Sequence, residues 1–415
     1  MAQVTIYHFL AFKEHIPARR QKYVVQSNCT LKICVYFSAV LPQQNTKTMS
    51  ITVVNIVSEQ TIPNIVFVKE MPQANRYLFI TTQKMEEKGV TDNIIKVCGI
   101  PMHQTTKLPV LENSFQNITY RLKELNLNKD SETQYLVNIT GGTKPMSIVV
   151  HDFFRQLNSC IYYMPLGSNG FMLCHAEKDE PIVPVSCKLN LTQYLQGYGF
   201  EIANPAEINQ MTVIPEFTRL VFEEKLLNTA EIGLLNKYIE TFAKENHYQP
   251  GSISLTNPPH ELVALPAFLY YTVKFPLQDN TILNSREIQY LTGGWFKEFL
   301  YQQLKTKYQL TDNDIGLNAK LVKNNLVIEP HLIYTHQNSL YMGNTVIAPR
   351  KTELENTIYR LSGLKKGRNF GLQSKGFIAI AENYRDKTGN IKFDLNNRAA
   401  LQDILLHDRN SLMNL

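Results

Sequence analysis

The chain reads QYLVNIT over residues 134–140 and continues as GGTKPMSIVVHDFFRQL over residues 141–157. The first run is typical of a buried strand, and the second has the apolar spacing of a helix. Two glycines between them allow the backbone to approach a ligand closely. Thr143 is expected to cap the helix, and Lys144 adds positive charge to an N-terminus that already favours phosphate or ribose oxygens. A tight β–α turn with an ordinary cap would explain the same residues without a ligand.

The same alternation of strand and helix extends on both sides of this turn. Strand-like runs are SITVVNIVS (50–58), RYLFITT (76–82) and SCIYYMPLG (159–167), and helix-like runs are IPNIVFVKEM (62–71), QKMEEKGVTDNIIKVCGI (83–100) and LENSFQNITYRLKELNL (111–127). Strands that alternate with helices predict right-handed crossovers and a parallel sheet, so we expect a Rossmann-like α/β domain. Ligands of such sheets bind at the carboxyl ends of the strands, where the strand order reverses.

Three polar turns follow three of these strands, and we expect them to meet at one edge of the sheet. Three such turns favour a nucleotide-like site more strongly than any one of them alone. The expected ligand residues are Ser58, Glu59, Gln60, Thr61 and Asn64 in the first turn, Thr81 and Thr82 in the second, and Thr140, Gly141, Gly142, Thr143, Lys144 and Met146 in the third.

Composition narrows the class of protein. The net charge is +6, but residues 1–48 contribute +5 of it, which leaves +1 for the rest and no global basic field for a polyanion. The six cysteines form no CxxC pair, which favours a reducing cytoplasm. No apolar run reaches the roughly 18–20 residues of a membrane span, so no membrane partner is expected.

Residues 1–48 lack a clear period, and we expect folded structure to begin near Met49. These residues are expected to be an extension of the folded chain, or the product of a start codon chosen too far upstream. The alternative is an additional strand pair formed by KYVVQS (22–27) and LKICVYF (31–37).

The second half of the chain has a different pattern. Residues 189–284 are mainly helical and predict a connector with a proline-rich segment, TNPPHELVALPAF (256–268). From residue 285 the sequence predicts one helix through REIQYLTGGWFKEFLYQQLKTK, followed by a mostly β core that includes LNAKLVKNNLVIE, HLIYTH, SLYMGNTVIA and GFIAIAE. Trp295 is expected to bury its ring in the packing of that helix.

These motifs together resemble a known family. A strand, SEQTIPN and a helix, followed by a strand, TGGTKPM and a helix, resemble the CARF domain, the cyclic-oligoadenylate sensor of type III CRISPR defence. The downstream LTGGWFKE (291–298) and DIGLN (314–318) resemble the restriction-endonuclease-like unit of one CARF subfamily. The resemblance covers about residues 49–415. It implies a CARF sensor over 49–188, a helical connector over 189–284 and a nuclease-like α/β domain over 285–415.

The nuclease chemistry of that subfamily does not carry over to this chain. The family needs a metal-binding Asp on one strand and a Glu-x-Lys on the next. Alignment on Leu340-Tyr341 puts His331 at the Asp position, Asn344 at the Glu position and Val346 at the Lys position. Lys297 also stands where the resemblance implies an acid, although Glu298 follows it. His331 and His336 are five residues apart, on opposite faces of a strand, and predict no metal pair.

The leading hypothesis is a cytoplasmic homodimeric sensor of cyclic oligoadenylate, with tetra-adenylate as the favoured ring. Its nuclease-like domain would act by regulation or as a scaffold, or would bind nucleic acid without cutting it. No cofactor is expected. One alternative is an active nuclease that uses Glu298 and Glu329 with Mg²⁺ or Mn²⁺. Another is a ring nuclease that cleaves its own ligand by positioning the ribose 2′-hydroxyl near Lys144. A third is a generic nucleotide-binding α/β module joined to an interaction domain.

Overall fold

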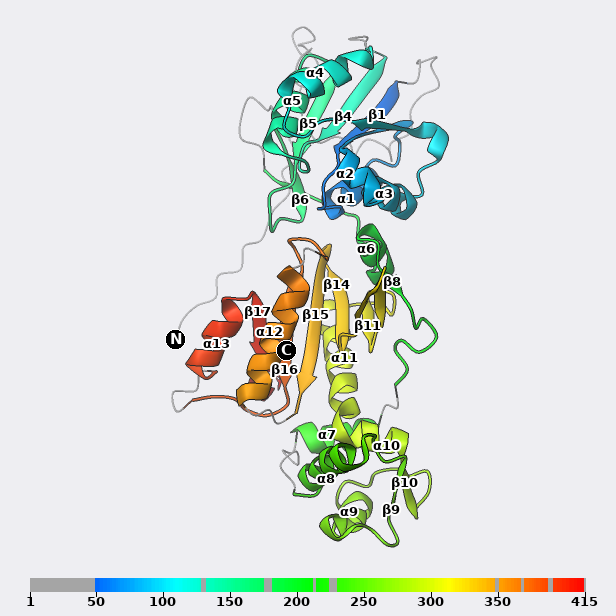
Figure 1. Ribbon diagram of the computed structural model, residues 1–415, viewed down its shortest axis with the longest axis vertical. Coiled ribbons are helices and arrows are strands. Elements are labelled where there is room, and N and C mark those ends of the chain that lie inside the picture. Colours follow the sequence, from blue (N-terminus) through cyan, green and yellow to red (C-terminus); the bar gives the residue numbers. More distant parts are fainter. Residues whose placement is uncertain are drawn as a thin grey trace, which may run out of the picture. The chain divides into compact units, whose positions relative to one another are not determined.

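The computed structural model describes residues 49–415 apart from 128–131, 175–180, 212–213, 224–229, 348–350, 367–368, 387–390 and 414–415 (Figure 1). The predicted extension 1–48 and the alternative strand pair within it lie outside the described residues.

The first half of this region is built on a sheet with the strand order β3-β2-β1-β4-β5-β6-β7. Strands β1 to β5 run parallel, and β6 and β7 are added antiparallel at one edge. The order reverses between β1 and β4, which are neighbours. The strands are β1 (Ser50–Ile56), β2 (Arg76–Thr81), β3 (Thr105–Pro109), β4 (Thr133–Asn138), β5 (Ser159–Tyr163), β6 (Gly170–Leu173) and β7 (Val183–Pro184).

Helices cover both faces of this sheet, because the strands β1, β2 and β4 bury side chains on both of their faces. Val54 and Ile56 of β1 share one core with α4 (Phe115–Glu124) and α5 (Lys144–Phe154). The alternate positions face the other side, where α1 (Ile62–Glu70) lies with α2 (Gln83–Glu87) and α3 (Val90–Cys98). Figure 1 shows these two groups of helices. The predicted Rossmann-like α/β fold is confirmed.

The second half contains a five-stranded mixed sheet with the order β11-β14-β15-β16-β17. Its first three strands are antiparallel, and β15, β16 and β17 are parallel. The strands are β11 (Ile315–Leu317), β14 (Leu332–His336), β15 (Ser339–Val346), β16 (Lys375–Ile380) and β17 (Ile404–His407). A small second sheet joins β8 (Glu201–Ile202), β12 (Leu321–Lys323) and β13 (Leu326–Ile328).

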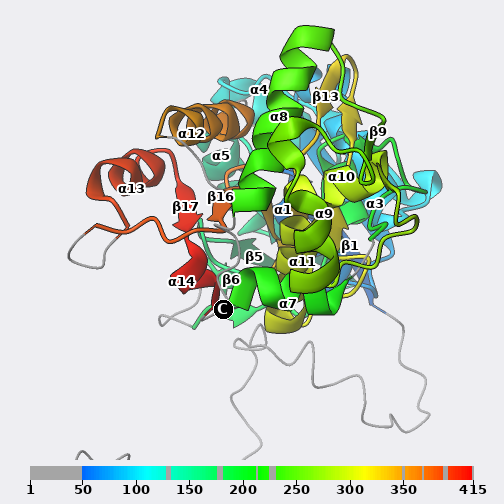
Figure 2. The ribbon, with the colours of Figure 1, turned by 90° about the horizontal axis from the view of Figure 1, so that it is seen from below.

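Helices also lie on both faces of the mixed sheet. Helix α11 (Trp295–Tyr308) packs on β11 and β14, whereas α12 (Lys351–Lys366) packs on β15 and β16. Helix α13 (Phe393–Ala400) packs on β17, and α14 (Arg409–Met413) follows that strand. Figure 2 shows α12 and α13 beside β16 and β17. The expectation of a mostly β core was therefore wrong, because the parallel pairs β15–β16 and β16–β17 need crossover helices.

The predicted connector contains several short and medium helices. They are α6 (Leu191–Gly197), α7 (Pro215–Glu223), α8 (Ala230–Asn246), α9 (Leu265–Ala267) and α10 (Ser285–Gln289), with a short hairpin of β9 (Ser252–Ser254) and β10 (Ile282–Asn284). Of these helices, α6 contacts β14 and α7 contacts α11. Side chains of α7 and α8 share one hydrophobic core with α11, β14 and β16. Trp295 is fully buried in this core, as predicted.

The single helix predicted from residue 285 is interrupted. Helix α10 ends at Gln289, and α11 begins only at Trp295. Residues 290–294 form a π-helical turn, in which Gly293 leaves helical geometry. Among the described residues, no helix is both long and apolar enough to cross a bilayer.

Candidate functional site

The turns that follow β1 and β4 lie next to each other where the strand order reverses. Asn55 near the end of β1 is in register with Asn138 at the end of β4, and Ile56 pairs with Ile80 of β2. The carboxyl ends of all three strands therefore form one edge, as the sequence predicted. This is the position at which open α/β sheets bind ligands.

A buried network of asparagine side chains holds the two turns together. Asn138 donates to the side-chain oxygens of Asn55 at 3.0 Å and Asn64 at 2.9 Å. Its own oxygen accepts from the backbone N–H and the hydroxyl of Thr140, at 3.1 and 2.6 Å. Thr140 in turn accepts from the Met164 N–H at 2.9 Å. Because buried amide networks are costly when unpaired, this arrangement fixes the backbone of the turn.

The two glycines of the third turn are needed for packing against β1. A Cβ on Gly141 would overlap the carbonyl oxygen of Ile56, and a Cβ on Gly142 would overlap the Ile56 side chain. Gly142 also has a φ of +77°, which favours glycine. The glycines therefore bring the turn close to the neighbouring strand. Gly142 is also exposed and remains available to a ligand.

The prediction that the Thr143 side chain caps α5 was wrong. Thr143 occupies the N-cap position, but its hydroxyl makes no bond to the helix. It donates instead to the carbonyl oxygen of Glu112 at 2.6 Å, which ties the turn to the loop before α4. Lys144 is exposed at the first position of α5.

The remaining predicted ligand residues divide into half-buried and buried groups. Ser58, Glu59 and Gln60 are half-buried: Ser58 accepts from the Gln60 N–H, Glu59 pairs with Lys88 at 2.5 Å, and the Gln60 side chain accepts from the Leu372 N–H at 2.7 Å.

The buried group is Thr61, Asn64, Thr81, Thr82 and Met146. Thr81 donates to Glu86 at 2.8 Å, and the Thr82 hydroxyl accepts from the Met85 N–H at 3.3 Å. Because these side chains are buried beneath the turns, a ligand would contact the half-buried and exposed residues first.

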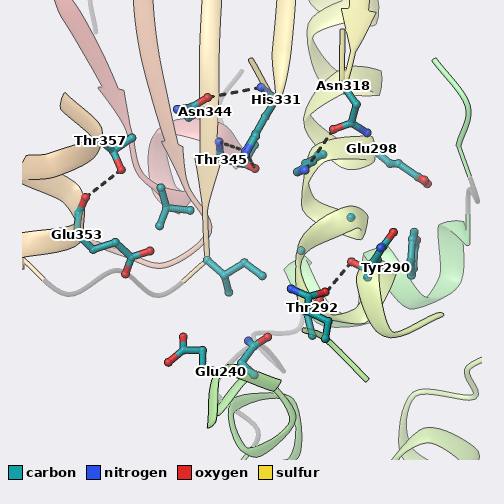
Figure 3. A pocket seen from close by; sticks show the side chains of 18 of the residues that line it. Glu240, Tyr290, Thr292, Glu298, Asn318, His331, Asn344, Thr345, Glu353 and Thr357 are labelled. Carbon is teal, nitrogen blue, oxygen red and sulfur yellow. Dashed lines mark hydrogen bonds between the residues drawn. The ribbon is translucent and has the colours of Figure 1, made fainter. Parts of the chain in front are cut away.

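A second candidate site is an open cavity of about 1390 Å³ at the ends of β14 and β15 (Figure 3). His331, Asn344 and Val346, the three positions that the family resemblance aligns with catalytic residues, all line it, together with Lys297 and Glu298. Glu329 does not line the cavity and instead pairs with Lys320 at 3.4 Å. Helices α8, α10 and α12 supply other parts of the wall.

His331 is held in a neutral form inside this cavity. Its Nδ1 accepts from the Thr345 N–H at 3.0 Å, and the Thr345 hydroxyl lies 2.9 Å from the same nitrogen. The proton of the neutral ring is therefore on Nε2. Burial, followed by the positive charges of Lys297 and Arg360, lowers the pKa of His331 to about 4.

Asn344 lies between His331 and Arg360. In one orientation of its amide, the oxygen is 3.5 Å from the His331 backbone nitrogen. In the other, the oxygen accepts from Arg360 Nη2 at 2.8 Å and the NH₂ group donates to the Gly343 carbonyl at 3.1 Å. The second orientation satisfies both ends of the amide and presents no negative charge to the cavity.

The residues present do not fit a hard divalent metal ion. Mg²⁺ and Mn²⁺ prefer carboxylate oxygens, whereas the aligned positions hold an imidazole, an amide and a valine. Within the described residues, no group of three or more His, Cys, Asp or Glu side chains could hold a metal ion. In Figure 3 the Glu298 carboxylate points away from His331 and Asn344. His336 contacts the ring of Tyr308 at 4.7 Å, at the opposite end of β14 from His331.

Sequence reasoning missed two residues of this cavity. Arg360 belongs to α12, a helix that was not predicted, and no motif surrounds it. Thr345 lies between the two aligned positions Asn344 and Val346 and fixes the tautomer of His331. Only the strand pairing of β14 with β15 shows that Thr345 and His331 are neighbours.

Comparisons with known proteins agree with the architecture. Residues 52–194 match the family model of the Card1 CARF domain. No curated protein matches the chain at a significant level. The structure of Can2 from Sulfobacillus thermosulfidooxidans in complex with cyclic tetra-adenylate is similar, with a TM-score of 0.63 and 18% identity over 88% of this chain and 97% of that chain.

Protein VC1899 from Vibrio cholerae is similar as well, with a TM-score of 0.66 and 15% identity over 88% of this chain and 95% of that chain. At these identities the likeness shows the fold. The match to the CARF model bears out the predicted resemblance to a CARF domain over residues 52–194.

Proposed function

We propose that the N-terminal α/β domain binds cyclic oligoadenylate at the turns that follow β1 and β4. The observation that carries the proposal is the pair of adjacent turns at the reversal of strand order, fixed by Asn138 and leaving Lys144 exposed. The match of residues 52–194 to a CARF domain supports the ligand class, and the Can2 complex supports the tetra-adenylate ring.

The proposed protein is a cytoplasmic homodimer in CRISPR signalling. A ring of repeated nucleotides has two-fold symmetry, and an isologous dimer offers the same turn to both of its halves. The C-terminal domain is proposed to have the restriction-endonuclease-like fold without metal-dependent cleavage. The proposal rests on the neutral side chains at the three aligned positions, which offer a metal ion no carboxylate.

Calorimetry with cyclic tetra- and hexa-adenylate tests the ligand assignment. Lys144→Ala is expected to weaken ring binding by about tenfold or more, because a charge-assisted contact to phosphate contributes roughly 1.5–3 kcal/mol. Lys96→Ala is the matched control, since Lys96 is an exposed cation near the end of α3, away from the turns.

Failure of both rings to bind the wild-type protein would reject the proposed function. If wild-type protein and Lys144→Ala bind the ring with equal affinity, the protein binds cyclic oligoadenylate at a site other than the turn that contains Lys144.

A further inference from the structure

The cavity at the ends of β14 and β15 carries positive charge where a metal-dependent nuclease carries acids. Lys297 reaches it from α11, and Arg360 reaches it from α12 on the other face of the sheet. The positive charges of both residues act on His331, which lies at the strand ends. The sheet therefore brings two cations and a neutral imidazole to one place.

Neither cation has an acidic partner among the described residues. Lys297 Nζ makes a single hydrogen bond, to the side-chain oxygen of Asn318 at 3.2 Å (Figure 3). Lys305, two turns further along the same helix, instead pairs with Asp312 at 2.5 Å. Burial of the Lys297 ammonium lowers its pKa.

The acids that line the cavity do not neutralise this group. In Figure 3, Glu298 points to the far side of α11 from His331, Glu240 lies below the strand ends, and Glu353 lies beside Thr357, on the other side of β15 from His331. Three kinds of donor line the same part of the cavity, because the charges of Lys297 and Arg360 both act on His331. They are two free N–H bonds of the Lys297 ammonium, the Nε2–H of His331 and the guanidinium of Arg360.

We propose that this cavity binds a phosphate group directly through Lys297 and Arg360, without a divalent metal ion. An ammonium and a guanidinium are the side chains best suited to phosphate oxygens, and a neutral imidazole adds a further donor. The positive side chains thus take the place of the metal ion that the nuclease family uses to neutralise phosphate. The phosphate can come from inorganic phosphate, a mononucleotide or a nucleic-acid strand, because the shared chemistry is the oxyanion.

Calorimetry on the full chain in the presence of EDTA tests the proposal with inorganic phosphate, adenosine monophosphate and a single-stranded oligonucleotide. At least one probe is expected to bind, and Lys297→Met and Arg360→Gln are each expected to weaken it by about tenfold. Lys305→Met is the matched control on α11. The pattern across the three probes identifies the source of the phosphate.

Several outcomes would overturn the proposal: no probe binds, binding requires added Mn²⁺, or both variants bind as tightly as the wild-type protein. Arg360→Gln keeps the test decisive if Lys297→Met fails to fold, because Arg360 is exposed on α12. The oligonucleotide is expected to be recovered uncut after incubation with Mn²⁺ and cyclic tetra-adenylate. Ring binding is measured separately through Lys144→Ala, so failure here is distinguishable from failure of the proposed function.

Discussion

His331 is a buried base whose charged form the folded protein disfavours. Its pKa is about 4 in the folded chain, against about 6.5 for an exposed histidine. Because the unfolded chain binds a proton first as the pH falls, this residue favours folding above about pH 6.5 and opposes it progressively down to about pH 4. Its own contribution to acid sensitivity is therefore a loss of stability between these values.

His331→Gln is expected to reduce the acid sensitivity of the fold. Between pH 7 and pH 5 the wild-type protein is expected to lose up to about 2 kcal/mol more unfolding free energy than the variant. Urea unfolding at the two pH values measures the difference. His103→Gln is the control, because His103 is exposed. Equal pH dependence in wild-type protein and His331→Gln would show that the imidazole is not held neutral.

Single residues also show where sequence reasoning ends. The placement of His331, Asn344 and Val346 at one cavity followed from two hydrophobic residues, Leu340 and Tyr341, because strand pairing has a fixed period. The role of Thr143 did not follow, since its hydroxyl bonds to Glu112, 31 positions earlier in the chain. A threonine that caps a helix and a threonine whose hydroxyl bonds to a distant loop can have the same local sequence. They differ only in their tertiary contacts.

At the scale of helices and strands, α4 and α5 carry exposed apolar side chains next to the proposed ligand turn. Phe115 is 50% exposed, Tyr120 62% and Ile148 51%. Ile148 is one helical turn after Lys144, so the two side chains share one face of α5. The Thr143–Glu112 bond joins the turn to the loop that leads into Phe115. A second copy that covers these side chains would also close over the ligand turn.

Ile148→Glu is therefore expected to convert the proposed dimer to a monomer and to weaken ring binding by about tenfold or more, because a buried unpaired charge disfavours the interface. Light scattering after size-exclusion chromatography measures the mass. Leu401→Glu is the control, since Leu401 is 81% exposed but belongs to the C-terminal domain. A variant that remains dimeric would place the interface on another surface.

Elements with long apolar runs could be predicted, and short or polar ones could not. β1, α1, β4 and α5 each carry enough apolar residues in period for their type to be clear. β3 reads TTKLP and buries only Leu108, so it forms because β2 lies beside it. The boundary between α2 and α3 depends on Gly89, whose φ of +65° cannot be inferred from a polar, helix-forming run.

At the scale of the whole described region, a few polar side chains join the N-terminal sheet to the mixed sheet. Asn338, in the turn between β14 and β15, accepts from the Leu189 N–H and donates to Asn169 and to the Cys187 carbonyl, each at 2.9 Å. Gln60, in the turn after β1, accepts from the Leu372 N–H. From the predicted connector, Tyr194 of α6 donates to the Phe370 carbonyl, in the loop before β16, at 2.9 Å.

The bond to Gln60 links the proposed ligand site to the loop before β16. Leu372 lies three residues before β16, and β16 pairs with β15 so that Ile378 is opposite Asn344. Gly371 has a φ of +79°, and a Cβ there would overlap the Tyr198 hydroxyl, so the chain can approach the first turn only with glycine at this position. A shift of the first turn would therefore act on β16, the strand that pairs with Asn344 of β15.

Gln60→Leu is expected to remove this link while leaving the two sheets folded. The Leu372 amide should exchange with solvent about fivefold faster in the variant, because a hydrogen bond of roughly 1 kcal/mol no longer protects it. Hydrogen exchange measured by mass spectrometry over residues 369–380 checks this, with Gln83→Leu as a control because the Gln83 side chain donates to Glu87. Cyclic tetra-adenylate is expected to slow exchange in this segment of the wild-type protein and to have a smaller effect in Gln60→Leu. Unchanged exchange at Leu372 would mean that Gln60 does not hold the loop in solution, and the coupling would then have to pass through Asn338, whose three hydrogen bonds join the other end of β14 and β15 to the same domain.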